Sequence, residues 1–476
     1  MERLKNPIVV DLDGTLVKTD LLLENILLFL NGYPLRFFNL IVLLFSGKAV
    51  FKRYLAEAVL PDVTLLPYNK EFLDWLIKRR AEGVRLVLAT ASHKLIADKV
   101  AAHLNVFDEV IGTEETNLAS KNKRDLLVQR YGEHGFEYVG NSSADLPVWK
   151  SASVIHVVNP ESGVLTAAQK IGPIGMLFDN RRPYYRVLIK SLRLHQWVKN
   201  LLIFVPLLAS HRVTEGKLLW SGLVAFVSFG TCASSIYLIN DLLDLQNDRR
   251  HATKCNRPLA SGSLPILHAL FLIPILLSAV LAMSLWLLPI RFAGMLIIYT
   301  LLAAGYSLRI KRVVMLDVIT LASLYTLRVL AGVAAMSLIV TFWILAFCLF
   351  IFLSLAFLKR YTELRDAHEK HKTEETSGRG YYPCDFDLLA TLGGASGYTS
   401  VLVLALYINE AADGKLYRSP EWMWVACPLL LYWLSRVWLL AHRGQMQHDP
   451  IVFALRDRVS WGIALCLLIS FAMATL

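Results

Sequence analysis

The sequence predicts a chain in two parts: an N-terminal α/β doubly wound domain with a helical cap, followed by an all-α polytopic membrane bundle of about nine helices. The first part, up to about residue 180, carries charges throughout and alternates helix and strand patterns, as layered α/β domains do. From about residue 196, apolar stretches of roughly 18 to 23 residues recur, the length that crosses a bilayer. The 476 residues are 55% hydrophobic with a formal net charge of +11, which is typical of a membrane protein with basic flanks.

Composition also predicts where the parts begin and end. We expect a soluble domain at 1–175 with its cap at about 16–84, a basic juxtamembrane linker at 176–195 and a membrane domain at 196–476. The cap segment is apolar, but Gly32, Pro34 and Arg36 interrupt it, so it is a poor spanning helix. Two interpretations stay open: a cap over a catalytic site, and a cap that also rests on the membrane surface.

The first predicted strand of the soluble domain, within 8–15, ends in two carboxylates, Asp11 and Asp13. Residues two apart on an extended chain project to one side. There the pair can share a cation or act as nucleophile and acid/base.

Two further predicted strands also end in polar residues. One ends at Thr90, and the other runs into Asn141 and then Asp145. Polar residues at the ends of parallel strands mark the edge of a doubly wound sheet where ligands bind.

The run Asp-x-Asp-Gly-Thr, with Thr90, a lysine (Lys121 or Lys123) and the later acidic element, resembles the haloacid dehalogenase-like phosphohydrolases. The resemblance implies that Asp11 is the nucleophile and Asp13 the general acid/base, and that Thr90 and the lysine bind the phosphoryl group. The implied Mg²⁺ ligands are Asp11, Asp13, Asn141 and Asp145.

One position departs from that family, which usually has an aspartate where this chain has Asn141. An amide oxygen can still bind Mg²⁺, but the site loses one negative charge. An active phosphatase and a degenerate domain kept for scaffolding or substrate capture therefore both remain open.

Nine spans are predicted in the membrane domain. They cover about 196–211, 217–240, 266–288, 291–308, 313–335, 339–358, 388–408, 422–441 and 459–476. The first is the weakest, because Lys199 and Asn200 leave only 201–209 continuously apolar. Loops on one side carry 16 basic residues against 5 on the other, so the positive-inside rule predicts a cytoplasmic N-terminal domain and an outside C-terminus. We expect a multi-pass protein of the bacterial inner (cell) membrane.

The end of the second predicted span carries Asn240 and three aspartates, Asp241, Asp244 and Asp248. Their spacing of i, i+3 and i+7 puts the carboxylates on one face if the helix continues. Such hard oxygen ligands suit Mg²⁺, which takes carboxylates together with substrate phosphates. The basic residues that follow can supply charge for a diphosphate. They are Arg249, Arg250, Lys254 and Arg257. The alternative is an ordinary polar loop.

This acidic segment, followed by Arg-Pro-Leu-Ala-Ser-Gly at 257–262, resembles the signature of the UbiA superfamily of intramembrane prenyltransferases. The resemblance covers roughly 185–476. It implies that Mg²⁺ held by the aspartates binds a diphosphate, which then leaves while metal and basic residues stabilise its charge.

Finer motifs look like the decaprenyl-phosphate phosphoribosyltransferase branch of that superfamily. Most members have a second aspartate run between spans six and seven, but this chain has a basic and aromatic segment at 359–366. The branch uses phosphoribosyl diphosphate as donor and a polyprenyl phosphate as acceptor. Candidate phosphate-binding residues are Lys199, Lys254, Arg257, Lys359, Arg360 and Arg379. Tyr361 and Glu363 are candidates for the ribose hydroxyls, and Asn240 for the substrate.

Two of these interpretations have alternatives. Lys359 and Arg360 can simply anchor a cytoplasmic helix end. Arg328 lies within a predicted span, where a charge is costly without a partner, so we expect it to pair with Asp317 or to face the lipid phosphate.

The fusion of the two parts predicts a reaction sequence. The transferase would release a lipid-linked ribose 5-phosphate, and the head would remove the 5-phosphate. A prenyltransferase that moves an isoprenoid from its diphosphate to an aromatic or other small acceptor is one alternative, and a non-catalytic carrier with an accessory head is another. The basic charge follows the membrane face, so we expect no nucleic-acid partner; an oligomer is possible.

Overall fold

The computed structural model describes residues 6–33, 36–45, 47–339, 341–369, 380–413, 419–446 and 449–475. The chain divides into two compact units. The first contains Met1–Arg193 and Tyr237–Ile275, and the second contains Leu194–Ile236 and Leu276–Leu476. The acidic segment therefore belongs to the same unit as the soluble head.

The head contains a six-stranded sheet in the order β3-β2-β1-β4-β5-β6, and every pairing in it is parallel. The strands are β1 (Ile8–Val10), β2 (Leu86–His93), β3 (Glu109–Thr113), β4 (Glu137–Gly140), β5 (Val154–Val158) and β6 (Ile174–Phe178). This confirms the predicted doubly wound fold. The strand order reverses at β1, and in such sheets the crevice at the reversal point binds ligands.

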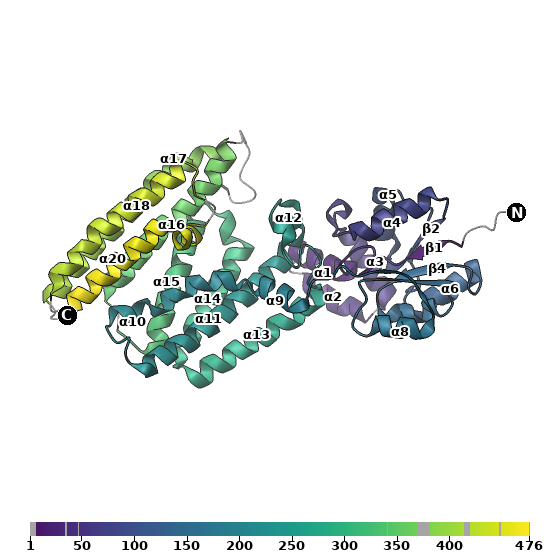
Figure 1. The fold of residues 1–476 in the computed structure, drawn as a ribbon, viewed down its shortest axis with the longest axis horizontal. Helices are drawn as coiled ribbons and strands as arrows, with labels where there is room; N and C mark the ends of the chain where they lie inside the picture. Colours follow the sequence, from purple (N-terminus) through teal and green to yellow (C-terminus); the bar gives the residue numbers. More distant parts are fainter. Residues whose placement is uncertain are drawn as a thin grey trace. The chain divides into compact units, whose positions relative to one another are not determined.

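Helices cover both faces of this sheet (Figure 1). One face packs on α4 (Lys70–Ala81) and α5 (Lys94–Leu104), and the other packs on α6 (Lys121–Tyr131) and α8 (Val164–Ile171). Because strand side chains alternate, Val10 belongs to the first core, while its neighbour Val9 belongs to the second. Both faces are buried, which explains why the strands read as continuous apolar runs.

Of the described helices in the predicted cap range 16–84, α4 packs on the sheet and three form the cap. They are α1 (Leu21–Gly32), α2 (Phe37–Leu44) and α3 (Lys48–Ala58). The side chain of Asp20 caps α1 by accepting the Leu23 N–H at 3.0 Å. Phe29 of α1 packs with Phe51 and Leu55 of α3. Helix α2 exposes large apolar side chains, with Phe38 74% and Val42 67% exposed.

The acidic segment is not one uninterrupted helix. Helix α11 (Gly216–Leu243) ends before Asp244, and α12 (Leu245–Arg250) begins after it. The Asp244 N–H still bonds the Asn240 carbonyl at 2.9 Å, and the Asp248 N–H bonds the Asp244 carbonyl at 2.8 Å. Helical spacing is thus kept through the break.

The membrane domain is helical, as predicted. Among the residues that the structure describes, eight helices are long and apolar enough to cross a membrane. They are α11, α13 (Ile266–Leu287), α14 (Ile290–Leu308), α15 (Leu316–Met336), α16 (Phe342–Glu369), α17 (Phe386–Asp413), α18 (Ala426–His442) and α20 (Arg458–Thr475). The spans of α17 and α18 include the 3₁₀ turns before them, from Pro383 and Glu421.

The first of the nine predicted spans differs from the structure. It forms a 3₁₀ helix, Leu194–Phe204, followed by the short α10 (Val205–Ala209). Lys199 and Asn200 are buried there and hydrogen-bond within the second unit. The polar pair therefore faces protein partners, and the segment is too short to cross a bilayer.

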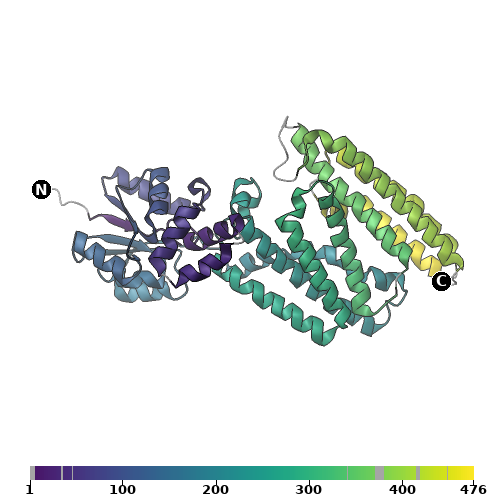
Figure 2. The same cartoon turned by 180° about the vertical axis from the view of Figure 1, so that it is seen from behind.

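Small residues let the last helices pack closely. Helices α16, α17 and α18 run side by side, and α20 packs on α18 (Figure 2). A Cβ added at Gly393 of α17 would lie 2.3 Å from the Trp438 ring of α18, so only glycine permits this approach.

Candidate functional site

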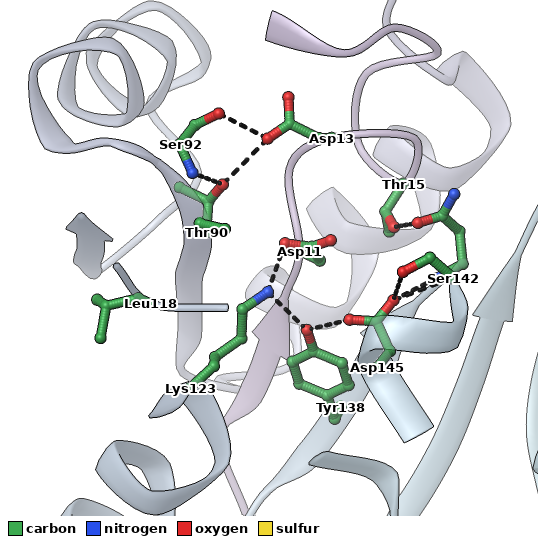
Figure 3. A network of polar contacts seen from close by, with 12 residues as sticks. Asp11, Asp13, Thr15, Thr90, Ser92, Leu118, Lys123, Tyr138, Ser142 and Asp145 are labelled. Carbon is green, nitrogen blue, oxygen red and sulfur yellow. Dashed lines mark hydrogen bonds and ion pairs between the residues drawn. The ribbon is translucent and has the colours of Figure 1, made fainter. Parts of the chain in front are cut away.

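The head site lies at the carboxyl edge of the sheet beside β1. Asp11 directly follows β1, and its N–H donates to the Val139 carbonyl of β4 at 3.0 Å. Lys123 of α6 reaches in from the neighbouring helix, and its Nζ lies 2.7 Å from Asp11 Oδ1 (Figure 3). Both side chains are buried. Lys121, the other lysine that the sequence allowed, is exposed.

Tyr138 connects this ion pair to Asp145. Lys123 Nζ donates to the Tyr138 hydroxyl at 3.0 Å, and that hydroxyl donates to Asp145 Oδ1 at 2.7 Å. Asp145 Oδ2 accepts the N–H groups of Asn141 and Ser142 at 3.0 and 2.9 Å. Asp145 therefore holds the loop that carries Asn141.

Asp13 is held by hydroxyl groups and by the cap. Ser92 Oγ donates to Asp13 Oδ2 at 2.6 Å, and Thr90 Oγ1 lies 3.4 Å from the same oxygen. The Leu21 N–H at the start of α1 donates to Asp13 Oδ1 at 2.9 Å. The candidate acid/base is thus fixed from both β2 and the cap.

The turn after Asp13 leaves room for Asn141. Gly14 has φ +73°, and a Cβ there would lie 2.3 Å from Asn141 Nδ2, so this turn requires glycine. Thr15 Oγ1 donates to Asn141 Oδ1 at 3.3 Å. The amide oxygen at this position is therefore oriented by a direct contact.

Burial dominates the electrostatics of the head site. Burial raises the pKa of Asp11 to about 7, although Lys123 partly offsets it, and Asp145 and Asp13 raise it further. Burial raises the pKa of Asp13 to about 6, with a contribution from Asp20. Burial alone would lower the pKa of Lys123, but the carboxylates of Asp11 and Asp145 raise it overall.

Three carboxylates, those of Asp11, Asp13 and Asp145, surround the buried side chain of Lys123. Carboxylates and an amide oxygen are hard donors that suit Mg²⁺. The donor types therefore suit the metal, with Asp11 and Asn141 as the residues that would hold it and Asp145 as their support, while the Asp13 carboxylate is already engaged by Leu21, Ser92 and Thr90.

Sequence reasoning missed three residues at this site. Ser92 contacts Asp13, Tyr138 links two charged residues, and Lys52 of the cap donates to the Ala91 carbonyl and to Asn117 at 2.6 and 2.8 Å. A hydroxyl two residues after Thr90 was an available signal for Ser92. Neither Tyr138 within a strand nor Lys52 within the cap carries a local signature.

In the acidic segment, Arg257 lies between two of the three aspartates. Its Nη1 contacts Asp248 and lies 3.1 Å from Asp241 Oδ1, and Arg193 also contacts Asp241. Asp241 and Asp248 are buried. Asp244, like Asn240 and Lys254, is half-buried. The structure thus brings Asp241 and Asp248 to one cation, whereas the sequence predicted all three carboxylates on one face.

This geometry fits Mg²⁺ only in part. Two carboxylates already share a positive group, and burial raises the pKa of Asp248 although Arg257 lowers it. Within the described ranges of the chain, no three His, Cys, Asp or Glu side chains converge as a metal site. Mg²⁺ commonly takes one or two carboxylates and completes its shell with substrate phosphates, so Asp241 and Asp248 are the residues that would hold it.

One of the expected diphosphate-binding residues has another role. Arg249 is buried against Glu24 of α1, with Nη1 2.9 Å from Glu24 Oε2. Its charge is neutralised within the head unit and is not available to a diphosphate. Two residues of the basic run therefore have different roles: Arg249 pairs with the cap, and Arg257 faces the aspartates.

In the second unit, Lys199 pairs with Asp449. Lys199 Nζ lies 2.6 Å from Asp449 Oδ2. Asp449 also caps α19 (Pro450–Arg456) by accepting the Ile451 N–H at 3.0 Å. Burial alone would raise the pKa of Asp449, but Lys199 lowers it overall.

Arg360 is the centre of a buried polar cluster. It is 1% exposed and contacts Asp317 and Glu363, and it donates to the Tyr306 hydroxyl at 2.8 Å. Tyr381 donates its hydroxyl proton to Asp317 as well. Both carboxylates are therefore committed to one guanidinium.

The expected pairing of Arg328 with Asp317 is wrong. Arg328 instead donates to Asn200 Oδ1 at 3.0 Å and to the Tyr299 hydroxyl at 3.2 Å. It also lies over the rings of Phe229 and Tyr325, 5.4 and 5.3 Å from their centroids. Aromatic faces can stabilise a buried cation without a carboxylate.

The remaining candidates of α16 point in different directions. Tyr361 bonds His442 of α18 at 3.0 Å and lines an apolar cavity of about 360 Å³ between α16, α17 and α18. It thus lies on another helix face from Glu363. Lys359 is half-buried. Arg379 lies outside the described residues.

Comparison with known proteins relates both parts of the chain to established families. Residues 201–473 match the UbiA prenyltransferase family, and residues 8–150 match the haloacid dehalogenase-like hydrolases. The protein y4nM of Sinorhizobium fredii is 35% identical over 99% of this chain and 91% of its own length.

Two further relatives each match more than half of the chain. The nodulation protein NoeC of Azorhizobium caulinodans is 34% identical over 56% of this chain and 86% of its own. The decaprenyl-phosphate phosphoribosyltransferase of Mycolicibacterium smegmatis is 31% identical over 57% of this chain and 87% of its own. A solved UbiA homologue from Archaeoglobus fulgidus, bound to DMAPP and Mg²⁺, matches 60% of this chain and 96% of its own at 16% identity, with a TM-score of 0.45.

Proposed function

Because this chain belongs to the UbiA prenyltransferase family and carries a haloacid dehalogenase-like head, we propose that it is a two-step enzyme of lipid-linked sugar synthesis. The membrane domain transfers 5-phosphoribosyl from phosphoribosyl diphosphate to a polyprenyl phosphate, and the head removes the 5-phosphate of the product. Both steps depend on Mg²⁺. The protein is a polytopic membrane protein, and we place its head on the cytoplasmic side of a bacterial inner membrane.

The observation that carries the choice of donor is the Arg360 cluster. Asp317 is fully buried against Arg360, itself 1% exposed, whereas the Arg257 side chain beside Asp241 and Asp248 is 28% exposed. We therefore assign the metal to the acidic segment and not to the Arg360 cluster. A site with one acidic segment suits two phosphate-bearing substrates, because a second one would repel the acceptor phosphate. The similarity to a protein named decaprenyl-phosphate phosphoribosyltransferase supports the same choice.

In the transfer step, an oxygen of the acceptor phosphate forms the new bond to the anomeric carbon. The bond from that carbon to the diphosphate oxygen breaks, and the diphosphate leaves with the electron pair. Mg²⁺, when bound, neutralises the charge of the leaving group. Asp241 and Asp248 supply the carboxylates of the site, and Arg257 supplies a positive charge beside them.

In the phosphatase step, the Asp11 carboxylate attacks the phosphorus of the 5-phosphate and the ester bond breaks. Asp13 gives its proton to the departing ribose oxygen and then takes a proton from the water that hydrolyses the aspartyl phosphate. A pKa of about 6 suits a group that must both give and accept a proton near neutral pH. Lys123 orients Asp11 through their 2.7 Å contact.

One experiment tests both steps. Membranes that contain the protein are incubated with Mg²⁺, labelled phosphoribosyl diphosphate and a polyprenyl phosphate. The lipids are then extracted, and their masses are measured by mass spectrometry. The expected label in the lipid fraction should vanish with Asp241→Asn. With Asp11→Asn it should remain and carry the 5-phosphate. The exposed Asp74→Asn is the matched control.

Two outcomes would contradict the proposal. Lipid that stays unlabelled, while diphosphate is released from a prenyl diphosphate and a small aromatic acceptor, would make the protein a prenyltransferase. A 5-phosphate that survives equally in the unaltered protein and in Asp11→Asn would leave the head without a phosphatase role.

A further inference from the structure

Helix α1 of the cap contacts both candidate sites of the first unit. Its N-terminal residue, Leu21, donates its N–H to the carboxylate of Asp13 at 2.9 Å. One turn later, Glu24 forms two hydrogen bonds with Arg249 of α12, at 2.5 and 2.9 Å. At its other end, Asn31 Nδ2 donates to the Leu243 carbonyl at 3.1 Å. A single helix therefore connects the phosphatase acid/base to the acidic segment.

The periodicity of α1 identifies the helix face that contacts the acidic segment. Glu24, Leu27, Leu28 and Asn31 stand at i, i+3, i+4 and i+7, which is one helix face. All four line a small cavity of about 110 Å³ together with residues 242–243 and 245–247. This face is thus directed at the acidic segment along the whole length of α1.

Burial distinguishes the Glu24–Arg249 pair from an ordinary surface ion pair. The Glu24 side chain is 1% exposed and that of Arg249 is 4% exposed. The third donor of Arg249, Nε, bonds the Ala260 carbonyl at 2.9 Å. The Arg249 guanidinium therefore attaches α12 by hydrogen bonds both to the cap and to the turn before Gly262.

A second close approach lies beside this pair. A Cβ added at Gly262, where φ is +69°, would lie 2.5 Å from the Lys18 carbonyl oxygen. The backbone at Gly262, which follows the acidic segment, and the backbone before α1 thus touch without side chains between them. With the more exposed Arg250–Asp62 ion pair at 3.2 Å, three contacts hold residues 245–262 against the cap.

The consequence concerns Asp248, which stands one residue before Arg249. Arg257, which lies between Asp241 and Asp248, belongs to the same segment, 245–262, that packs against the cap. We infer that Glu24 is a positioning residue of the transferase: through Arg249 it fixes the segment that carries Asp248 and Arg257, so the phosphatase cap is a structural part of the diphosphate site. This inference rests on the proposed function for its catalytic consequence, but not for the docking itself.

The test compares three variants of the full chain in detergent with the unaltered protein. Glu24→Gln and Arg249→Gln each remove one half of the buried pair, and the double variant removes both. Glu57→Gln is the control, because Glu57 pairs with Arg53 in the same cap but is 61% exposed. Hydrogen exchange of residues 245–262 is measured first, and KM and kcat for phosphoribosyl diphosphate second.

Each single variant should accelerate exchange in 245–262 by about tenfold and raise KM for the donor by about tenfold, the lower end of what lost support of a metal ligand costs. Exchange in strand β2 should not change. The double variant should lose no more than the worse single variant, because the two residues act as a unit. Glu57→Gln should match the unaltered protein.

Unchanged exchange in 245–262 would overturn the inference that the Glu24–Arg249 pair holds this segment against the cap. Effects of the two substitutions that add in the double variant would overturn it as well. Faster exchange with an unaltered KM and kcat would overturn the positioning role. If the unaltered protein shows no phosphoribosyl transfer at all, the proposed function fails, while the exchange comparison still decides whether Glu24 holds the segment.

Discussion

Replacing Asp13 by asparagine should make the metal-free head more stable at pH 8 while it loses phosphatase activity. The carboxyl of Asp13 has a folded-state pKa of about 6, above the value of about 3.9 for an unfolded chain. Its stabilising contribution is therefore fully present below about pH 4 and is lost as pH rises through about 6. Ionised Asp13 thus destabilises the head near neutral pH.

The structure gives the size of this effect. A shift of about two pKa units corresponds to about 3 kcal/mol at pH 8. Asp13 is only half-buried, and solvent screening reduces the figure to about 1 to 2 kcal/mol. Asparagine is isosteric and can still accept the Leu21 N–H, while its amide group can donate to Ser92.

The assay is brief proteolysis of the full chain across a urea series in EDTA, at pH 5 and pH 8, scored by survival of the head. Asp13→Asn should resist more urea than the unaltered protein at pH 8 and about the same at pH 5. Asp74→Asn, an exposed carboxylate of α4, is the control. The reasoning is refuted if Asp13→Asn is less stable at pH 8, or if the unaltered head in EDTA is more stable at pH 8 than at pH 5.

Three further predictions concern the other charged residues. Lys123→Met should raise the pKa of Asp11 by about 1 to 3 units, so phosphatase activity at pH 7 should fall at least about fivefold and partly return at higher pH; an unmoved acid limb of the pH–rate profile would contradict this. Adding Mg²⁺ should stabilise the head more at pH 8 than at pH 5, because the metal binds the ionised carboxylates, and equal stabilisation in a thermal melt at both pH values would argue against a carboxylate site. Arg360→Leu leaves Asp317 buried without its cation and should destabilise the membrane domain by about 3 to 5 kcal/mol, measured by loss of folded protein on heating in detergent, whereas Arg53→Leu at the surface should change little.

Local patterns in the sequence predicted which side chains lie close together at the strand ends and in the acidic segment. Asp11 and Asp13 are two residues apart after a strand, and parallel strands bring their carboxyl ends to one edge whatever the helices between them do. The spacing of Asp241 and Asp248 likewise brings both to one cation, because helical hydrogen bonding continues through Asp244 between α11 and α12. In each case the relevant geometry is set by the backbone period.

Only the tertiary structure determined which partners the buried charges have. The sequence offered Lys121 and Lys123 equally, and packing of α6 turned only Lys123 toward Asp11. It suggested Asp317 for Arg328, but the structure pairs Asp317 with Arg360, 43 residues away.

The Glu24–Arg249 pair joins residues 225 positions apart, and nothing in either local sequence identifies the other. A buried charge takes whichever partner the packed helices bring within reach, because desolvation makes an unpaired ion costly. Periodicity therefore determines which face a residue occupies, while the packing of distant elements determines what that face meets.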